Sequence, residues 1–397
     1  MQLVTSKAMD PDGGVTRLLY SKEWVETQKV LKKIMEQEGM TTHFDDIGNL
    51  YGRVSGTEKP DETILTGSHM DSVKNGGRYD GMYGIIAGIV AIGHLVRKYG
   101  LPKKNIEVVA FAEEEGSRFD TTFWGSKNFL GLEQPESVKT LSDDSGQNFV
   151  EAMHEAGFDF KRKTGFQRED VQAFIEAHVE QGNVLETEKK EIGIVDSIVG
   201  QYRFNIQVYG TANHAGTTPM SYRRDSLYAA VRMINGILDR AKNCGAPLVA
   251  TVGHISVKPD MSNIVPGETE FSLDVRHTNE EFLDSFVEEI KDFMEKTAAE
   301  CNVKIKIDTW MRESPVLMDK NLVSYLYDVC QNKKISSKIM HSGAGHDSQI
   351  IAQKIPTAMI FVPSKDGISH NPREYTDPQQ MVRGIEVLEE AIHGLAY

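Results

Sequence analysis

The sequence predicts an α/β protein in which helices flank a largely parallel sheet and a second, α+β domain is inserted into the chain. Three observations lead to this prediction. The length of 397 residues exceeds what one hydrophobic core normally supports, which favours two domains. Strand-like apolar runs alternate with helical stretches in the first part of the chain. Candidate residues of a single site lie on both sides of a middle block that has a different pattern.

The first part of the chain contains a strand, a helix and a strand in that order. Residues 63–66 and 106–112 are typical of buried strands, and residues 84–99 carry apolar side chains at helical spacing. This order favours a parallel sheet with helices on its faces, and ligands of such sheets gather at the C-terminal ends of the strands. Residues 69–71 and 113–115 follow the two strands directly, so we expect both segments at this edge.

The middle block begins near Gly200. Its strands alternate apolar and polar residues, as half-exposed strands do, and its helices are amphipathic. The expected elements are strands over residues 203–209, 248–257, 268–275 and 303–309, and helices over residues 222–242 and 280–301. After Pro315 the first pattern returns, with a strand at 357–362 and a helix at 378–393. These limits predict a discontinuous catalytic domain over residues 1–200 and 314–397 and an inserted domain over residues 201–313.

Composition restricts the class of protein. With 40% hydrophobic and 26% charged residues, the chain has the composition of an ordinary globular protein. It has no apolar run of membrane-spanning length and no signal-peptide core at its start, so we expect a cytoplasmic protein. The net charge of -14 argues against nucleic acid as a partner. The scattered cysteines, Cys244, Cys301 and Cys330, are expected to be free thiols.

Imidazole and acidic residues in glycine-marked or strand-end settings are the most informative feature of the chain. They are His69, Asp80, Glu115, His178 and His370. Three imidazoles and two carboxylates are about the ligand set that two divalent cations need when one carboxylate bridges them, because borderline metals favour nitrogen and oxygen donors. The pattern predicts a paired-metal hydrolase. It leaves zinc, manganese and cobalt open.

Each of these residues also has a simpler explanation when taken alone. A single His or Asp is more often a structural residue, and residues 113–115 could be a solvated acidic turn. Their surroundings favour the metal hypothesis. Asp71 stands two residues after His69, where it could orient the ring, and glycines near Asp80 would let the backbone approach a metal. Because the acidic run follows a buried strand, one of its carboxylates could bind metal while its neighbour acts as a base.

Several motifs carry a resemblance to a known family that covers nearly the whole chain. They occupy residues 13–20, 115–119, 123–127, 178–182, 213–220 and 341–347. In these motifs the chain resembles the dinuclear-metal aminoacylase and carboxypeptidase superfamily, in its amidase, hydantoinase and carbamoylase branch. The resemblance implies an exopeptidase-like catalytic domain with a mixed, mostly parallel sheet, and an inserted lid or dimerisation domain.

The resemblance also implies a role for each candidate ligand. His69 and His178 would hold one divalent cation, Glu115 and His370 would hold the other, and Asp80 would bridge the two. The cations would be zinc or manganese, with cobalt as a further possibility. Asp71 would orient the ring of His69 without binding a metal itself.

Catalytic and substrate-binding roles follow from the same resemblance. Glu114 would be the general base, and His214 would reach the reacting carbonyl from the inserted domain, from the neighbouring subunit of a homodimer. The implied substrate-binding set is Gln181, Arg203, His214, Asn263 and Arg276. Two of these positions have simpler alternatives, since Arg276 could be an ordinary surface charge and Asn263 could belong to a structural loop.

The implied reaction is hydrolysis of the ureido group of a small ureido acid. Allantoate is the expected substrate, with ureidoglycine, ammonia and carbon dioxide as products in the recovery of purine nitrogen. An N-carbamoyl-L-amino-acid hydrolase or a ureidopropionase is the alternative within the same chemistry. A catalytically silent binding protein of the same fold is the alternative outside it, and that alternative predicts a broken ligand or base position.

Overall fold

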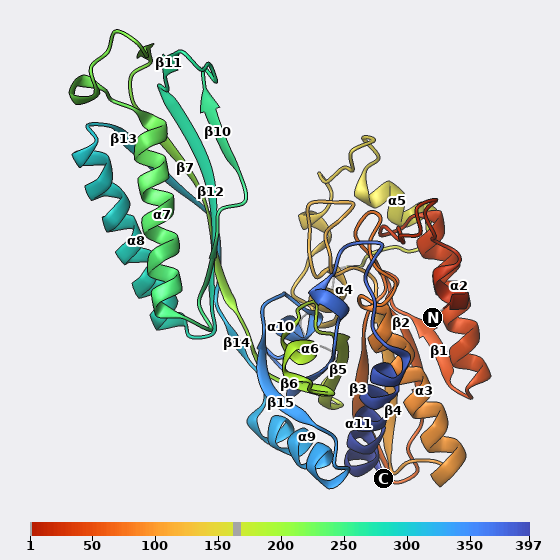
Figure 1. Cartoon of the computed structure of the whole chain (residues 1–397). Helices are drawn as coiled ribbons and strands as arrows, with labels where there is room; N and C mark the ends of the chain where they lie inside the picture. The colour runs from red at the N-terminus through yellow and green to blue at the C-terminus, as the bar shows by residue number, and fades with distance from the viewer. Residues whose placement is uncertain (1, 162–167) are drawn as a thin grey trace. The chain divides into compact units, whose positions relative to one another are not determined.

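The computed structural model describes residues 2–161 and 168–397. The chain forms two compact units, of which the first comprises Met1–Asp196 and Leu317–Tyr397 and the second comprises Ser197–Val316. In each unit, helices pack against a sheet (Figure 1). The second unit is thus an insertion between two segments that build the first.

Within the described residues, the first unit contains a nine-stranded sheet in the order β1-β2-β4-β3-β5-β16-β6-β14, with β15 paired to β6. The β4–β3, β3–β5 and β5–β16 pairs at its centre are parallel, whereas β1–β2, β2–β4 and β16–β6 are antiparallel. The strands span Thr41–Phe44 (β1), Leu50–Val54 (β2), Lys59–His69 (β3), Lys104–Phe111 (β4), Val171–Val179 (β5), Ile192–Ile198 (β6), Val316–Leu317 (β14), Ser337–Ser342 (β15) and Thr357–Val362 (β16).

Helices cover this sheet, and the burial of its central strands explains why they are apolar runs. All six residues of β16 are buried, as both faces of a parallel sheet normally are. The α-helices of the unit span Gln2–Thr5 (α1), Lys22–Gln37 (α2), Met82–Tyr99 (α3), Trp124–Phe129 (α4), Phe149–Glu155 (α5), Val184–Glu188 (α6), Lys320–Asn332 (α9), Asp347–Ile351 (α10) and Pro378–Ala396 (α11), with 3₁₀ turns at Pro135–Ser137 (η1) and Lys365–Gly367 (η3).

Helix α3 lies unusually close to the sheet because its inner face carries glycine. A Cβ atom placed at Gly84 would overlap the carbonyl oxygen of Ala177 on β5 and lie 2.8 Å from the Cβ of Ser68 on β3. A Cβ at Gly88 would lie 2.9 Å from side-chain atoms of Thr66. This close approach fixes the start of α3 beside the ends of β3 and β5.

The second unit is an antiparallel sheet with two long helices on one face. The sheet has the order β10-β12-β7-β13, with β9 also paired to β12, and a two-stranded ribbon pairs β11 with β8. Its strands span Gly200–Tyr209 (β7), Asn213–His214 (β8), Val249–Thr251 (β9), Ile255–Lys258 (β10), Ile264–Val265 (β11), Glu268–His277 (β12) and Lys304–Glu313 (β13). Its helices span Ser226–Cys244 (α7) and Glu280–Glu300 (α8), with a 3₁₀ turn at Met220–Tyr222 (η2).

One face of this second sheet forms the core of the unit. Along β7 buried and less buried residues alternate, and Phe204, Ile206 and Val208 pack with buried residues of α7 and α8. The opposite face carries Arg203, Asn205 and other polar side chains. This is the pattern of an antiparallel sheet with one covered face.

The predicted fold class is confirmed, because the chain combines a mixed, mostly parallel sheet with an inserted antiparallel unit. Two predicted elements differ. The helix expected from Tyr222 begins at Ser226, where the side chain of Asp225 caps it by accepting a hydrogen bond from the Tyr228 N–H. The strand expected over residues 248–257 is two short strands, β9 and β10, which pair with different parts of β12.

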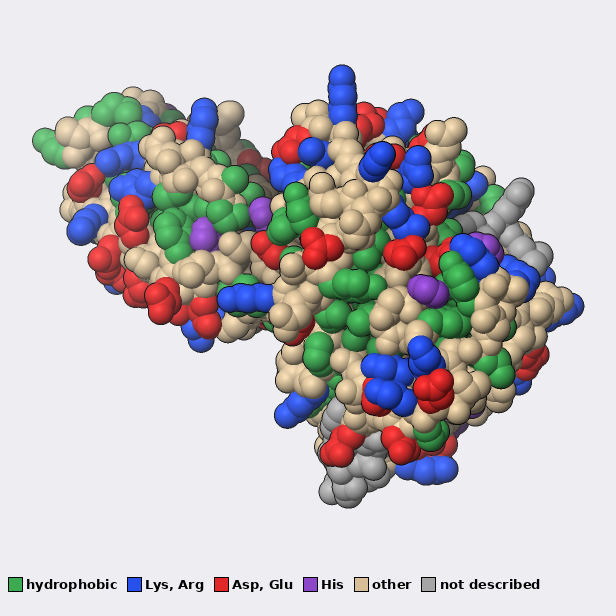
Figure 2. Space-filling model, turned by 90° about the horizontal axis from the view of Figure 1, so that it is seen from below, with side chains coloured by type: hydrophobic (Ala, Val, Ile, Leu, Met, Phe, Trp, Pro, Cys, Tyr) green, Lys and Arg blue, Asp and Glu red, His purple; other side chains and the backbone are tan. Residues whose placement is uncertain are grey.

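Other predictions from composition concern the surface and the thiols. None of the helices in the described ranges is long and apolar enough to cross a membrane. On the face seen in Figure 2, basic side chains are interspersed with acidic ones, which is unlike the basic stripe of a nucleic-acid-binding surface. Cys244, Cys301 and Cys330 are free thiols, as predicted.

Candidate metal centre

The candidate ligands of the first unit converge on one edge of its sheet. His69 is the last residue of β3, His178 lies near the end of β5, and Glu115 follows β4. Asp80 lies in the loop that leads into α3, and His370 lies in the segment after β16 and η3. The neighbouring strands are parallel, so their C-terminal ends meet at the same edge, where ligands of such sheets bind.

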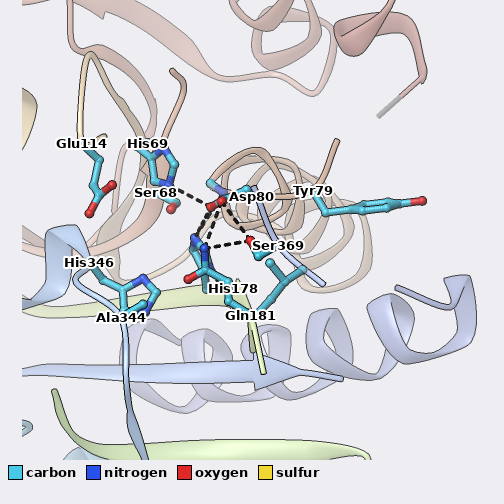
Figure 3. A network of polar contacts seen from close by, with 12 residues as sticks. Ser68, His69, Tyr79, Asp80, Glu114, His178, Gln181, Ala344, His346 and Ser369 are labelled. Carbon is cyan, nitrogen blue, oxygen red and sulfur yellow. Dashed lines mark hydrogen bonds and ion pairs between the residues drawn. The ribbon is translucent and has the colours of Figure 1, made fainter. Parts of the chain in front are cut away.

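The carboxylate of Asp80 lies at the centre of this group, and Figure 3 shows its contacts with His69 and His178. Its Oδ1 atom is 3.4 Å from Nε2 of His69 and 3.3 Å from Nε2 of His178. Its Oδ2 atom is 3.3 Å from Nε2 of His370, which is in turn 3.4 Å from Oε1 of Glu115. The two oxygens therefore face two different sets of ligand atoms.

These distances fit two cations bridged by Asp80. Ligand atoms that surround one tetrahedral zinc ion at about 2.1 Å lie about 3.4 Å from one another. Within the described residues, His69, Asp80 and His178 form one group able to hold a cation, and Asp80, Glu115 and His370 form another. Glu115 Oε1 is buried and accepts no hydrogen bond in the described structure beyond its ion-pair contact with His370, which suits an atom that binds metal.

The charges of the group also suit cations. Burial by itself would raise the pKa of Asp80, but contacts with His178, His370 and His69 hold it well below its usual range. Contacts with Asp80 and Glu115 raise the pKa of His370 to about 11. The carboxylates at this edge of the sheet thus stabilise positive charge strongly.

Asp71 connects the first histidine to the acidic segment after β4. Its Oδ1 atom is 3.2 Å from Nδ1 of His69 and accepts a hydrogen bond of 2.9 Å from the Glu114 N–H. Its Oδ2 atom accepts one of 3.1 Å from the Glu115 N–H. One buried carboxylate thereby orients an imidazole and fixes two neighbouring glutamates, as second-layer residues do in metal sites.

Glu114 lies beside His69 with a buried carboxyl group (Figure 3). Burial is the largest cause that raises its pKa well above the ordinary value, and the positive charge of His69 opposes this while Glu115, Asp347 and Asp71 add to it. A carboxylate with a raised pKa holds a proton more readily than an exposed one. That property suits a general base and acid.

Gln181 is the only member of the expected substrate-binding set in the first unit. Its Nε2 atom donates hydrogen bonds of 3.0 Å to Asp80 Oδ2 and 3.1 Å to Ser369 Oγ. Its backbone has a φ of 56°, in the left-handed region that residues other than glycine seldom adopt. The side chain of Gln181 thus contacts Asp80, the carboxylate that lies between the candidate ligands.

The other expected members lie in the second unit, where they form two pairs. His214 on β8 is exposed and lies next to Asn263, whose carbonyl accepts a hydrogen bond of 2.9 Å from the Ala215 N–H. Arg203 and Arg276 meet at Asp274. Arg276 donates to Asp274 through Nε at 2.8 Å and Nη2 at 3.0 Å, and Arg203 donates through Nε at 2.9 Å.

Three further residues near the centre were not predicted as site residues. Glu374 accepts hydrogen bonds from the Tyr79 and Asp80 N–H groups, and its pKa is raised to about 7 by burial and by Asp80. The ring of His346 lies 4.6 Å from that of His178, centroid to centroid. Arg17 is fully buried, and its Nε atom donates to the Met70 carbonyl. The motifs at residues 13–20 and 341–347 mark two of these three residues, but their spacing alone predicts no contact.

A parallel-sheet edge that brings two adjoining cation positions next to a buried glutamate is the site of a metal-dependent hydrolase. Residues 65–394 match peptidase family M20/M25/M40, and the chain belongs to this family. The family resemblance seen in the sequence motifs is thereby confirmed.

The chain is also similar to curated proteins over almost its whole length. It is 48% identical to allantoate amidohydrolase of Escherichia coli (strain K12), over 99% of this chain and 96% of that protein. It is 43% identical to allantoate amidohydrolase of Bacillus subtilis (strain 168), over 97% and 94%. Among solved structures, an amidase of the hydantoinase/carbamoylase family from Burkholderia multivorans superposes with a TM-score of 0.94 at 32% identity and covers 100% of this chain and 96% of that one.

Proposed function

We propose that this protein is a metal-dependent amidohydrolase that cleaves the ureido group of allantoate. The observation that carries the proposal is the division of the Asp80 carboxylate between two sets of ligand atoms, beside the buried Glu114. The two allantoate amidohydrolases that share 48% and 43% of its residues support the choice of substrate. The products would be ureidoglycine, ammonia and carbon dioxide.

His69 and His178 would hold one cation, Glu115 and His370 the other, and Asp80 both. Bound there, two divalent cations would supply the Lewis acidity that lowers the pKa of water and polarises a carbonyl. Zinc, manganese or cobalt suits this mixture of imidazole and carboxylate ligands.

Glu114 would act first as a base and then as an acid. It would take a proton from the water that attacks the ureido carbonyl and return it to the departing nitrogen. Ammonia would then leave, and the remaining carbamate would lose carbon dioxide. Asp71 fixes the backbone of Glu114, so this transfer would start from a defined position.

His214, Asn263, Arg203 and Arg276 would bind substrate from the inserted unit, together with Gln181. A guanidinium group pairs well with a carboxylate, and a histidine can donate to the oxyanion that forms during attack. The inserted unit would thus act as a lid as well as a dimerisation domain.

The outer surface of α7 supports a homodimer formed through the inserted unit. Tyr228, Val231 and Leu238 are exposed by 58%, 52% and 37%, and their spacing places them along one side of the helix. An apolar stripe of this kind suits a second copy of the same helix. Sedimentation of the purified protein would test this, and a monomer at micromolar concentration would contradict it.

Ammonia release from several substrates tests the activity. The metal-loaded protein should release ammonia from allantoate with a higher kcat/KM than from N-carbamoyl-L-amino acids or ureidopropionate. A preference for an N-carbamoyl amino acid would assign the protein to that activity instead. If a protein shown to hold two metals turned over no ureido acid at all, the remaining explanation would be a catalytically silent binding protein of the same fold.

A further inference from the structure

Glu374 is a buried acidic residue to which the proposed mechanism gives no role. It lies four residues after His370, and only 4% of its surface is exposed. Its Oε1 atom accepts a hydrogen bond of 2.8 Å from the Tyr79 N–H and one of 3.2 Å from the Asp80 N–H. A residue near the end of the catalytic unit therefore holds the backbone of the central ligand, 294 positions earlier.

The second oxygen of Glu374 holds the loop of another ligand. Oε2 accepts a hydrogen bond of 3.1 Å from the hydroxyl of Ser369, the residue before His370. Ser369 also lies 3.4 Å from Asp80 Oδ2 and accepts from Gln181 (Figure 3). One carboxylate thus joins the loop of Asp80 to the loop of His370.

The loop of His370 needs such support. His370 has a φ of 51°, in the left-handed region where a side chain is disfavoured. Strained backbone of this kind persists when the surroundings determine it. The bond from Ser369 to Glu374 holds the residue directly before His370.

The chain leaves room for this carboxylate at Gly77. A Cβ atom placed at Gly77 would overlap the carboxyl carbon and both oxygens of Glu374. No left-handed φ requires glycine at this position. Glycine at position 77 therefore leaves the space that the Glu374 carboxylate occupies.

We propose that Glu374 is a positioning residue that sets the separation of Asp80 and His370 and thereby maintains the cation position they share with Glu115. This inference rests on the ligand roles proposed above. Loss of such a support typically weakens metal binding about 10- to 100-fold. The position that His69 and His178 form with Asp80 should be affected less, because Glu374 contacts neither histidine in the described structure.

Metal titration of the purified chain tests this. Metal-free wild type, Glu374→Ala, Glu374→Gln and Gly77→Ala proteins would be titrated with Zn²⁺ by calorimetry against a competing chelator. Wild type should bind two ions. Glu374→Ala should keep one and bind the second about 10- to 100-fold more weakly. Glu374→Gln should lose less, because its amide oxygen can still accept from the two N–H groups, and Gly77→Ala should weaken the same ion by displacing Glu374.

Glu107→Gln is the matched control. Glu107, on β4, is a fully buried carboxylate that pairs with Arg168, so its substitution should lower stability without touching the ligand loops. This variant should bind two ions normally even if its melting temperature falls. Normal binding of both ions by Glu374→Ala and Gly77→Ala would overturn the role of Glu374. A wild-type chain that binds fewer than two ions would instead overturn the proposed dinuclear centre, and the positioning role with it.

Discussion

His370 lies 3.3 Å from the Oδ2 atom of Asp80, whereas His69 and His178 face the Oδ1 atom of the same carboxylate. One side chain therefore divides the three imidazoles into a pair and a single residue. The pair comes from two strand ends, β3 and β5. The single residue comes from a loop and is half exposed, so the two cation positions are expected to differ in how firmly they hold metal.

His370→Ala should reduce the metal content of the chain from two ions towards one, since it removes a ligand of one position only. Elemental analysis of the variant measures this. Exhaustive chelation of the wild type should abolish turnover, and added manganese, cobalt or zinc should restore it. Full activity in protein shown to be metal-free would exclude the metal mechanism.

Glu114→Gln should keep both metals and lower kcat at least about a hundredfold, the size of effect expected when a general base is lost. Glu107→Gln is the control, because Glu107 is also buried but pairs with Arg168 rather than lying beside the candidate ligands. Its loss of kcat should be much smaller. Near-normal turnover in fully metallated Glu114→Gln would remove Glu114 from the mechanism.

Arg276→Lys should lower kcat/KM for allantoate about tenfold to a hundredfold, because a single ammonium group cannot make the two-pronged contact of a guanidinium with a carboxylate. Arg383→Lys, on the exposed side of α11, is a control that should change little. The assignment fails if the unaltered enzyme cleaves neutral ureides without a carboxylate as well as it cleaves allantoate.

Mixing two inactive variants tests whether His214 acts across a dimer. A hybrid of His214→Ala and Glu114→Gln chains has one complete site if the histidine comes from the partner. Activity should then recover towards half of normal per hybrid dimer. Hybrids that form, as shown by native mass measurement, but stay as inactive as both parents would refute a shared site.

Gly84→Ala should destabilise the protein, because its Cβ would overlap the Ala177 carbonyl oxygen and push α3 away from the sheet. Overpacking of this kind costs about 1–3 kcal/mol. Gly343→Ala is the control, since a Cβ there has no atom within 4 Å. Equal unfolding midpoints in denaturant for the two variants would contradict the close packing of α3.

The sequence was sufficient to predict that residues 69–71 and 113–115 lie at one edge of the sheet. His69 and Glu115 follow apolar runs, and the ends of neighbouring parallel strands must lie together. The half-buried strands and amphipathic helices of the insertion could also be predicted, because the spacing of their apolar residues follows the side of each element that is buried. Errors arose at element ends. Helix α7 begins at Ser226, directly after its cap Asp225, which is four residues later than the apolar pattern predicts.

Other parts of the site could not be predicted from local pattern. Glu374 stands in a turn without periodicity, and two of its partners, Tyr79 and Asp80, are almost three hundred residues away in the chain. The left-handed backbone of Gln181 and His370 could not be predicted either, because neither residue type requires this conformation. Such features depend on tertiary contacts that one sequence does not specify.

The pairing of Arg276 with Asp274 has a consequence for substrate affinity. The edge of the guanidinium that carries Nε and Nη2 is bonded to the carboxylate of Asp274 on the same strand. Binding a substrate carboxylate through these atoms would exchange one anion for another, so its free energy would be a difference between two similar contacts. Arg276 would then select anionic substrates, because only an anion could replace Asp274 in this contact, and the ureido end would have to supply the rest of the affinity.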